Sequence, residues 1–178
     1  MLRFRRPHEA DEVSDETGES IPVVALTATA VVAGSVRLGG RQPARALEDL
    51  SPVVIDDAVV MRLDDGTVGD VPRLPLEGGR LIALGQTAPA TWPRIEKGIV
   101  VDVGPYVILA KLERRLADLE AGRLMCRAAI VGFEAGEHWR TERLGATRIE
   151  SGHARTVRTG TFEDFEVACT LRRVAAGD

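Results

Sequence analysis

The chain carries the stretch Asp57-Ala-Val-Val-Met-Arg-Leu-Asp-Asp-Gly66 and, seventy positions later, Arg127-Ala-Ala-Ile-Val-Gly-Phe-Glu-Ala-Gly136, in which apolar and acidic residues follow the same order. The correspondence extends upstream, from Val36-x-Leu38 to Val107-x-Leu109 and from Leu47-x-Asp49-Leu50 to Leu116-x-Asp118-Leu119. Self-similarity at a nearly constant offset is typical of a duplicated unit, and the alternative is chance matching of Val, Ala and Leu. We therefore expect one small unit to occur twice.

Composition is that of an ordinary folded chain. Of 178 residues, 44% are hydrophobic and 28% are charged, which is enough apolar material for a stable core. Residues 1–20 differ, because arginines are followed there by six acids with few apolar residues between them. Such a segment buries too little surface to order itself, so we interpret 1–20 as a flexible tail. The start also lacks the apolar core of a secretory signal, and the default location is the cytoplasm.

The first unit is expected over 21–86. Val23 to Leu38 is rich in β-branched residues and predicts a strand, in which Gly34 indicates a bulge or a close backbone approach. Pro43 fits the first turn of a short helix that ends at Leu50. The remaining predicted elements of this unit are a strand over 53–63, a turn at Asp64-Asp65-Gly66, and a short strand over 80–86.

A proline-containing linker over 87–97 separates this unit from a second one over 98–178. Trp92 in the linker is interpreted as a plug against the core. The second unit is expected to contain a strand over 98–109, a helix over 111–121 with Gly122 as a left-handed cap, and a strand over 124–133. Further on, Phe165, Val167, Cys169 and Leu171 occur at every second residue, which favours a half-buried strand.

These elements predict an α+β fold that is predominantly antiparallel β, with two pseudo-repeated strand-helix-strand units and extra C-terminal strands. A ferredoxin-like arrangement with parallel crossovers is one alternative, and a pair of small barrels is another.

Charge is distributed unevenly along the chain. Residues 46–80 hold eight acids and three arginines, whereas residues 123–160 hold seven arginines and four acids. Opposite charges favour contact between the halves or between neighbouring molecules. An exposed row of arginines would bind an anion, a nucleic acid or an acidic partner; the candidates are Arg140, Arg143, Arg148, Arg155 and Arg158.

No catalytic or metal-binding pattern is evident. The histidines are scattered, Cys126 and Cys169 lack a Cys-x-x-Cys pattern, and both cysteines lie in apolar runs typical of buried thiols. The glycines from Gly34 to Gly40 lack the Lys and Ser/Thr of a phosphate loop. We therefore expect no metal site, no cofactor and no catalytic residue.

The leading functional hypothesis is a non-enzymatic protein-binding or assembly module, such as a structural or accessory subunit, with self-association or another protein as partner. Two alternatives are anion or nucleic-acid binding through the arginine-rich second half, and a small enzyme that uses His138 or His153 in a cleft between the repeats.

Overall fold

A computed structural model of the chain describes residues 18–77, 79–113 and 122–176. Within these residues the chain forms a sheet of ten strands, two α-helices and one short 3-10 turn. The first half contains β1 (Ser20–Thr27), β2 (Ala30–Arg37), α2 (Pro43–Asp49), β3 (Val53–Arg62), β4 (Val68–Leu76) and β5 (Leu81–Thr87). The second half contains β6 (Lys97–Val103), β7 (Tyr106–Leu112), β8 (Arg123–Ala135), β9 (His138–Glu150), η2 (Ser151–His153), β10 (Ala154–Thr161) and α3 (Phe162–Ala176).

The described strand pairings are all antiparallel, and the sheet order is β10-β6-β7-β8-β9-β5-β1-β2-β3-β4. The prediction of a β-rich α+β fold is confirmed. The alternative with parallel crossovers is wrong, because β2 and β3, which flank α2, pair antiparallel. The first five strands follow the order β5-β1-β2-β3-β4 and the last five the order β10-β6-β7-β8-β9, so the relative order is the same.

Two segments that were each predicted as one strand are hairpins. The run 23–38 turns back at Ala28-Thr29, where the Thr27 hydroxyl accepts a hydrogen bond from the Ala30 amide at 3.0 Å. The run 98–109 turns back at Gly104-Pro105, with Gly104 at φ +54°. A Thr side chain can satisfy a turn amide without glycine or proline, so hydropathy alone does not reveal the first turn.

Residues 165–171 form part of helix α3, so the predicted strand is wrong. Phe165 and Cys169 are buried, whereas Val167 and Leu171 are 57% and 66% exposed. Positions four residues apart share a face in a helix as well as in a strand, which is why the alternation misled. The deciding signal is Thr161-x-x-Asp164, because Asp164 accepts a hydrogen bond from the Thr161 amide at 2.8 Å and caps α3.

The predicted helix over 43–50 is confirmed as α2, and the turn at Gly66 is confirmed by its φ of +71°. The predicted start of the helix over 111–121 is wrong, because Lys111 and Leu112 belong to strand β7. Its other residues, apart from Glu113, lie outside the described part of the chain, as do residues 1–17 of the expected tail. Gly122 has the left-handed conformation expected of it, at φ +72°.

Gly34 confirms the predicted close approach. A β-carbon at this position would lie 2.4 Å from the Ile55 side chain, and the pairing of β2 with β3 shifts register between Ala33 and Ser35. Prolines at 72 and 75 are tolerated in β4 because it is the edge strand of the sheet, where an amide needs no partner strand.

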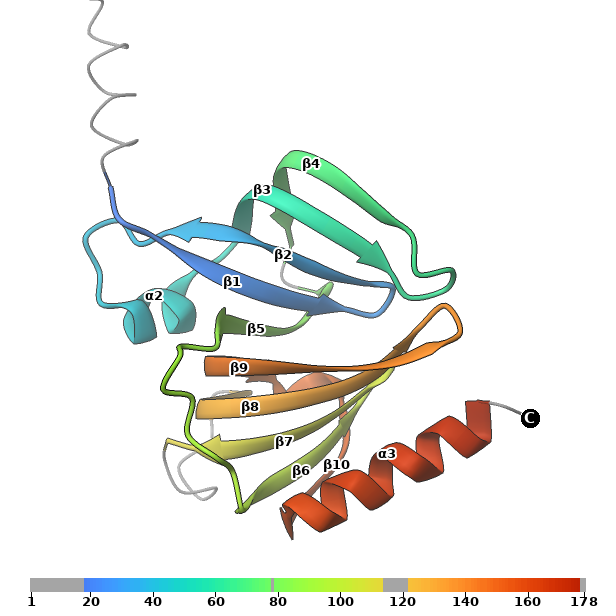
Figure 1. Cartoon of the computed structure of the whole chain (residues 1–178). Coiled ribbons are helices and arrows are strands. Elements are labelled where there is room, and N and C mark those ends of the chain that lie inside the picture. The colour runs from blue at the N-terminus through green and yellow to red at the C-terminus, as the bar shows by residue number, and fades with distance from the viewer. Residues whose placement is uncertain (1–17, 78, 114–121, 177–178) are drawn as a thin grey trace, which may run out of the picture.

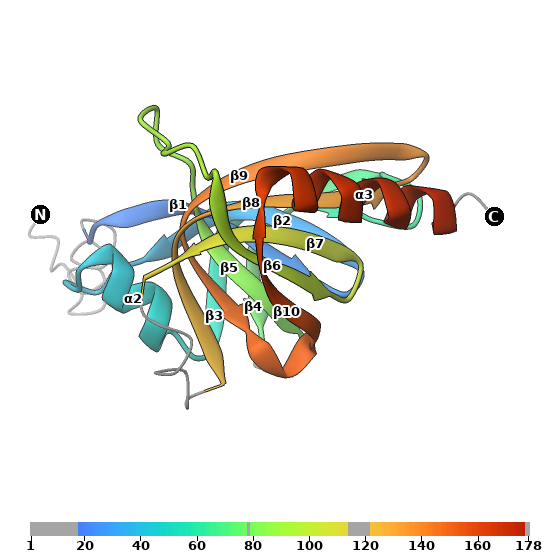
Figure 2. The same cartoon turned by 90° about the horizontal axis from the view of Figure 1, so that it is seen from below.

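One apolar core joins the two halves. Val24, Leu26 and Val31 of the first half pack with side chains of β6 to β9, while a second core lies within the first half and a third lies under α3. The Tyr106 hydroxyl donates to the Thr27 carbonyl at 2.7 Å, which ties β7 to the β1–β2 turn and satisfies a buried phenol. Burial raises the pKa of Tyr106. Figures 1 and 2 show the halves stacked, with α3 along the outer side of the second.

The two repeated stretches end in turns that touch each other. The Gly136 amide donates to the Leu63 carbonyl at 2.8 Å, and a β-carbon on Gly136 would lie 3.0 Å from the Asp65 carbonyl oxygen. Gly66 and Gly136 are both left-handed, at φ +71° and +62°. In Figure 1 the β3–β4 and β8–β9 turns meet at the same end of the molecule.

We expect Gly136→Ala to lower the free energy of unfolding by about 2–3 kcal/mol, because it combines an unfavourable backbone conformation with contact against a carbonyl. Gly39→Ala is the matched control, since Gly39 has φ +60° but open space around its β-carbon. It should cost only about 1 kcal/mol. Urea denaturation of both variants measures the difference, and equal losses would contradict contact between the two turns.

Candidate functional site

Aromatic side chains that are far apart in the sequence gather beside α3. Trp139, Thr141 and Arg143 occupy every second position of β9 and therefore share one face. Ile130 of β8 is paired with Arg143, and α3 contributes Phe162 and Phe165, whose rings lie 5.9 Å apart. Trp92 reaches the same region from the segment between β5 and β6.

Trp92 is held at both its polar and its apolar surfaces. Its indole nitrogen donates to the Leu144 carbonyl at 2.7 Å, and its ring packs against the core under α3. The Arg143 guanidinium lies over the ring, 5.1 Å from its centroid, at a distance that gives cation–π attraction. The interpretation of Trp92 as a plug is confirmed, but its ring also borders a hollow.

The Trp139 ring packs against Gly132 of β8. A β-carbon on Gly132 would lie 2.7 Å from the Trp139 ring and 2.8 Å from the Cys169 sulfur, so any larger residue would displace one of these side chains. The Arg173 guanidinium stacks over Trp139, 5.8 Å from the ring centroid. Each tryptophan therefore carries an arginine on its face.

Two hollows meet between these tryptophans. One has a volume of about 400 Å³ and lies toward Trp92, and the other has a volume of about 380 Å³ and lies toward Trp139. Both are lined by Ile130, Arg143 and Phe162. We call the two together the Trp–Arg groove. Its remaining lining residues are Arg94, Ile95, Thr141, Phe165, Glu166, Cys169, Thr170 and Arg173.

The Trp–Arg groove is positively charged. The guanidinium groups of Arg94, Arg143 and Arg173 line it, against the single carboxylate of Glu166. Its floor is apolar, because Ile130 and Phe165 are buried beneath it. An apolar floor with a few polar groups at the rim is the usual form of a ligand site, and volumes above about 300 Å³ accommodate a small molecule.

The five arginines predicted as an exposed row do not come together. Arg143 lines the Trp–Arg groove, whereas Arg140 lies on the opposite face of β9. Arg158 lines a separate hollow of about 300 Å³ on the other side of α3, and Arg155 lies at the register shift between Ala154 and Thr156 of β10 and lines neither this hollow nor the groove. Arg148 is only 2% exposed. Their role in binding an anion or a partner stays a prediction, to which the structure adds Arg94 and Arg173.

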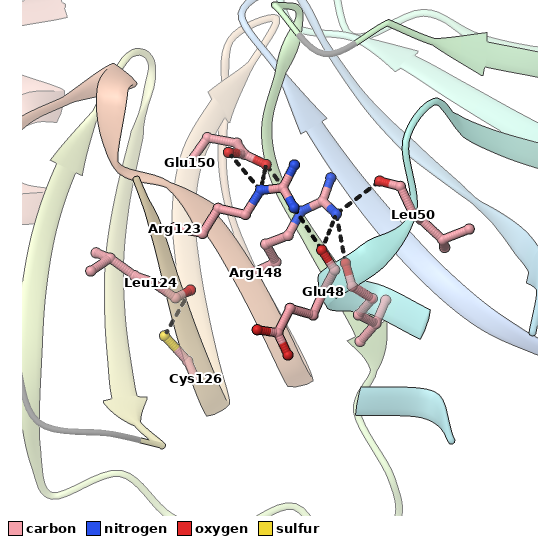
Figure 3. A network of polar contacts seen from close by, with 8 residues as sticks. Glu48, Leu50, Arg123, Leu124, Cys126, Arg148 and Glu150 are labelled. Atoms are coloured by element: carbon pink, nitrogen blue, oxygen red, sulfur yellow. Dashed lines mark hydrogen bonds and ion pairs between the residues drawn. The ribbon is translucent and has the colours of Figure 1, made fainter. Parts of the chain in front are cut away.

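Arg148 connects the two halves of the protein. From β9 its Nη1 donates to the carbonyls of Leu47 at 2.6 Å and Leu50 at 3.0 Å, at the C-terminal end of α2. Arg123 Nη1 donates to the Glu48 carbonyl at 2.6 Å, and the Glu150 carboxylate forms ion pairs with both guanidinium groups (Figure 3). Desolvation, followed by repulsion from Arg123, lowers the pKa of Arg148. This site is structural, because it satisfies helix carbonyls that otherwise lack partners.

The two cysteine thiols are buried, as the apolar runs around them indicate. Burial raises the pKa of the Cys126 thiol to about 12 and that of the Cys169 thiol to about 11, so both are protonated near neutral pH. His138 is the first residue of β9 and His153 lies in η2, beyond the far end of that strand, whose thirteen residues extend over roughly 40 Å. His153 and Arg80 border a further cavity of about 470 Å³ at the β1–β2 turn, lined mainly by apolar residues.

In the described part of the chain, histidines, cysteines and carboxylates form no group of three or more that could hold a metal ion. Neither of the described helices combines the length and the apolar character needed to cross a membrane. Comparison of the chain with protein-family models, with curated proteins and with solved structures finds no match.

We expect Arg148→Ala to lower the free energy of unfolding by about 3 kcal/mol, because it leaves Glu150 and the end of α2 without their buried partner. Arg148→Lys should restore only part of this loss, since one ammonium cannot reach three carbonyls and a carboxylate. Arg127→Ala, at an exposed position of β8, is the control and should change stability by less than about 0.5 kcal/mol. A wild-type denaturation midpoint for Arg148→Ala would contradict this role.

Proposed function

We propose that the chain is a non-enzymatic assembly module that associates with a second copy of itself through α3. The observation that carries this proposal is an exposed apolar row on that helix, Val167, Leu171 and Val174, which are 57%, 66% and 61% exposed. Their spacing of four and three residues places them on one side of α3.

The opposite side of α3 is already occupied. Phe165 and Cys169 are buried against the sheet, and Arg172 donates to the Asp102 carboxylate and to the Gly104 carbonyl. The helix is therefore fixed to the second half and presents its apolar row outward. Three large apolar side chains in a row at a helix surface favour a protein partner, because burying them removes apolar area from water.

The charges of α3 favour an antiparallel pair of identical helices. Glu163 and Asp164 lie in its first turn and Arg173 in its last. When two copies pack antiparallel, the acidic first turn of each faces the basic last turn of the other, whereas parallel packing would oppose like charges. A second copy of this chain therefore satisfies both the apolar row and the charges.

The proposal includes an origin by duplication. Its support is the equal relative strand order of the halves and the contact between the Gly66 and Gly136 turns. Equivalent side chains of the two repeated stretches also face the same side of the sheet. Met61 and Leu63 face the core shared by the halves, as do Val131 and Phe133 at the equivalent positions.

An experimental structure tests the duplication. We expect strands β1 to β5 to superpose on β6 to β10 in that order, with Gly66 falling on Gly136. Superposition that matches no strand with its equivalent would contradict the duplication, although self-association through α3 would not be affected.

For the proposed assembly, we expect the wild-type chain to have a mass above that of one chain in light scattering at tens of micromolar, and Leu171→Glu to have the mass of one chain. A charge at Leu171 cannot be buried in the apolar contact without a large desolvation cost. Thr170→Glu is the matched control, because Thr170 is exposed on the same turn but lies outside the apolar row. Its mass should equal that of the wild type.

A wild-type chain that stays monomeric at every concentration would overturn the self-association. Circular dichroism of Leu171→Glu should match the wild type, so loss of association can be separated from loss of folding. The expectation of a cytoplasmic location is retained as part of the proposal.

A further inference from the structure

We infer that the Trp–Arg groove is a binding site for nucleotides, in which bases stack against the aromatic and guanidinium planes and phosphates bind the arginines. This inference does not depend on self-association through α3. It develops the anion-binding alternative for the arginine-rich half around a different set of residues, of which Arg143 alone was expected from sequence.

The groove supplies both kinds of contact that a nucleotide needs. Guanidinium groups form paired hydrogen bonds with phosphate oxygens, and Arg94, Arg143 and Arg173 line the groove. Trp92, Trp139 and Phe162 provide planar surfaces, and Phe162 is 37% exposed. Base stacking on aromatic or guanidinium planes is the common mode of recognition for unpaired nucleotides.

The shape of the groove places Arg143 at its centre. The two hollows, of about 400 and 380 Å³, adjoin where both are lined by Arg143. Each is large enough for one small ligand. Two successive nucleotides would therefore fill one hollow each, with the phosphate between them on the Arg143 guanidinium, whereas a free nucleotide would fill one hollow only.

Arg143 and Arg173 are positioned to bind a phosphate. Arg143 lies over Trp92 and Arg173 over Trp139, and both arginines are exposed, so their guanidinium groups are accessible to a ligand. The described ion pairs use other arginines, namely Arg37, Arg62, Arg123, Arg148 and Arg172. Glu166 and Thr170 also line the groove, and both offer acceptors to the edge of a base, because the Thr170 hydroxyl proton is donated to the Glu166 carbonyl.

The test measures binding of fluorescein-labelled ten-nucleotide oligothymidylate and oligoadenylate to the full chain by fluorescence anisotropy, at low salt and at increasing salt. Unlabelled AMP and ATP, titrated against tryptophan fluorescence, form a second arm that detects free nucleotides. The chain has only two tryptophans, and both line the groove, so stacking should quench its fluorescence. Three phosphate contacts on a single strand predict that the logarithm of the binding constant falls with the logarithm of the salt concentration with a slope of about −2.

We expect Arg143→Ala to weaken binding at least tenfold and Arg94→Ala to weaken it severalfold. Arg140→Ala is the matched control, because Arg140 is an exposed arginine of the same strand on the opposite face. It removes the same charge and should change affinity less than twofold. Leu171→Glu, which alters the apolar row of α3, should bind as the wild type does, so the outcome is independent of the assembly test.

Binding of either the oligonucleotides or the free nucleotides that is lost in Arg143→Ala and kept in Arg140→Ala supports the site, and the two arms identify the source of the nucleotide. Equal weakening in Arg140→Ala would overturn it, because the attraction would then follow net charge alone. Absence of binding in both arms, or equal binding of polyglutamate, would also overturn it. Each variant is compared by circular dichroism with the wild type, and the Arg94→Ala variant tests the same groove from outside the sheet.

Discussion

Arg148 is the one charged side chain that the described part of this protein buries, and a buried charge is costly unless it is paired. Its guanidinium finds three backbone carbonyls at the end of α2 and the carboxylate of Glu150. A helix of seven residues is too short to persist alone, so α2 depends on tertiary contacts, which include this one and the burial of Ala46 and Leu47. The same contact, together with the pairing of β5 with β9 and the shared core, holds the first half against the second.

Stacking of the halves determines which surfaces remain for binding. The face that the halves share is filled by the common core, and the outer face of the second half is covered by α3. Along one edge of that helix, α3 leaves part of the sheet face uncovered, and the Trp–Arg groove lies there. The outward side of α3 keeps its apolar row. The two proposed sites thus use different sides of one helix, and Arg173 of the last turn lies close to both.

Part of the candidate site could be predicted from the sequence. Arg143 and Trp139 lie in a run of alternating residues, which places them on one face of a strand, and Trp92 was expected to pack against the core. Their convergence could not be predicted, because Trp92 and Arg143 are separated by fifty residues and by the whole of β6 to β8. The role of Gly132 could not be predicted from the sequence either, since it leaves room for the Trp139 ring, which comes from another strand.

The sequence by itself determined the local events of this fold. Asp-Asp-Gly66 specified a turn, Pro43 the start of a helix, and the β-branched runs the strands, because each depends on residues within a few positions. The tertiary structure decided what is set by distant contacts. It placed the alternating residues Phe165 to Leu171 in a helix, because burial of Phe165 and Cys169 against the sheet supports the helix start that Thr161 and Asp164 specify locally. It also separated the five arginines, since alternate residues of a strand face opposite ways and only packing determines which way is inside.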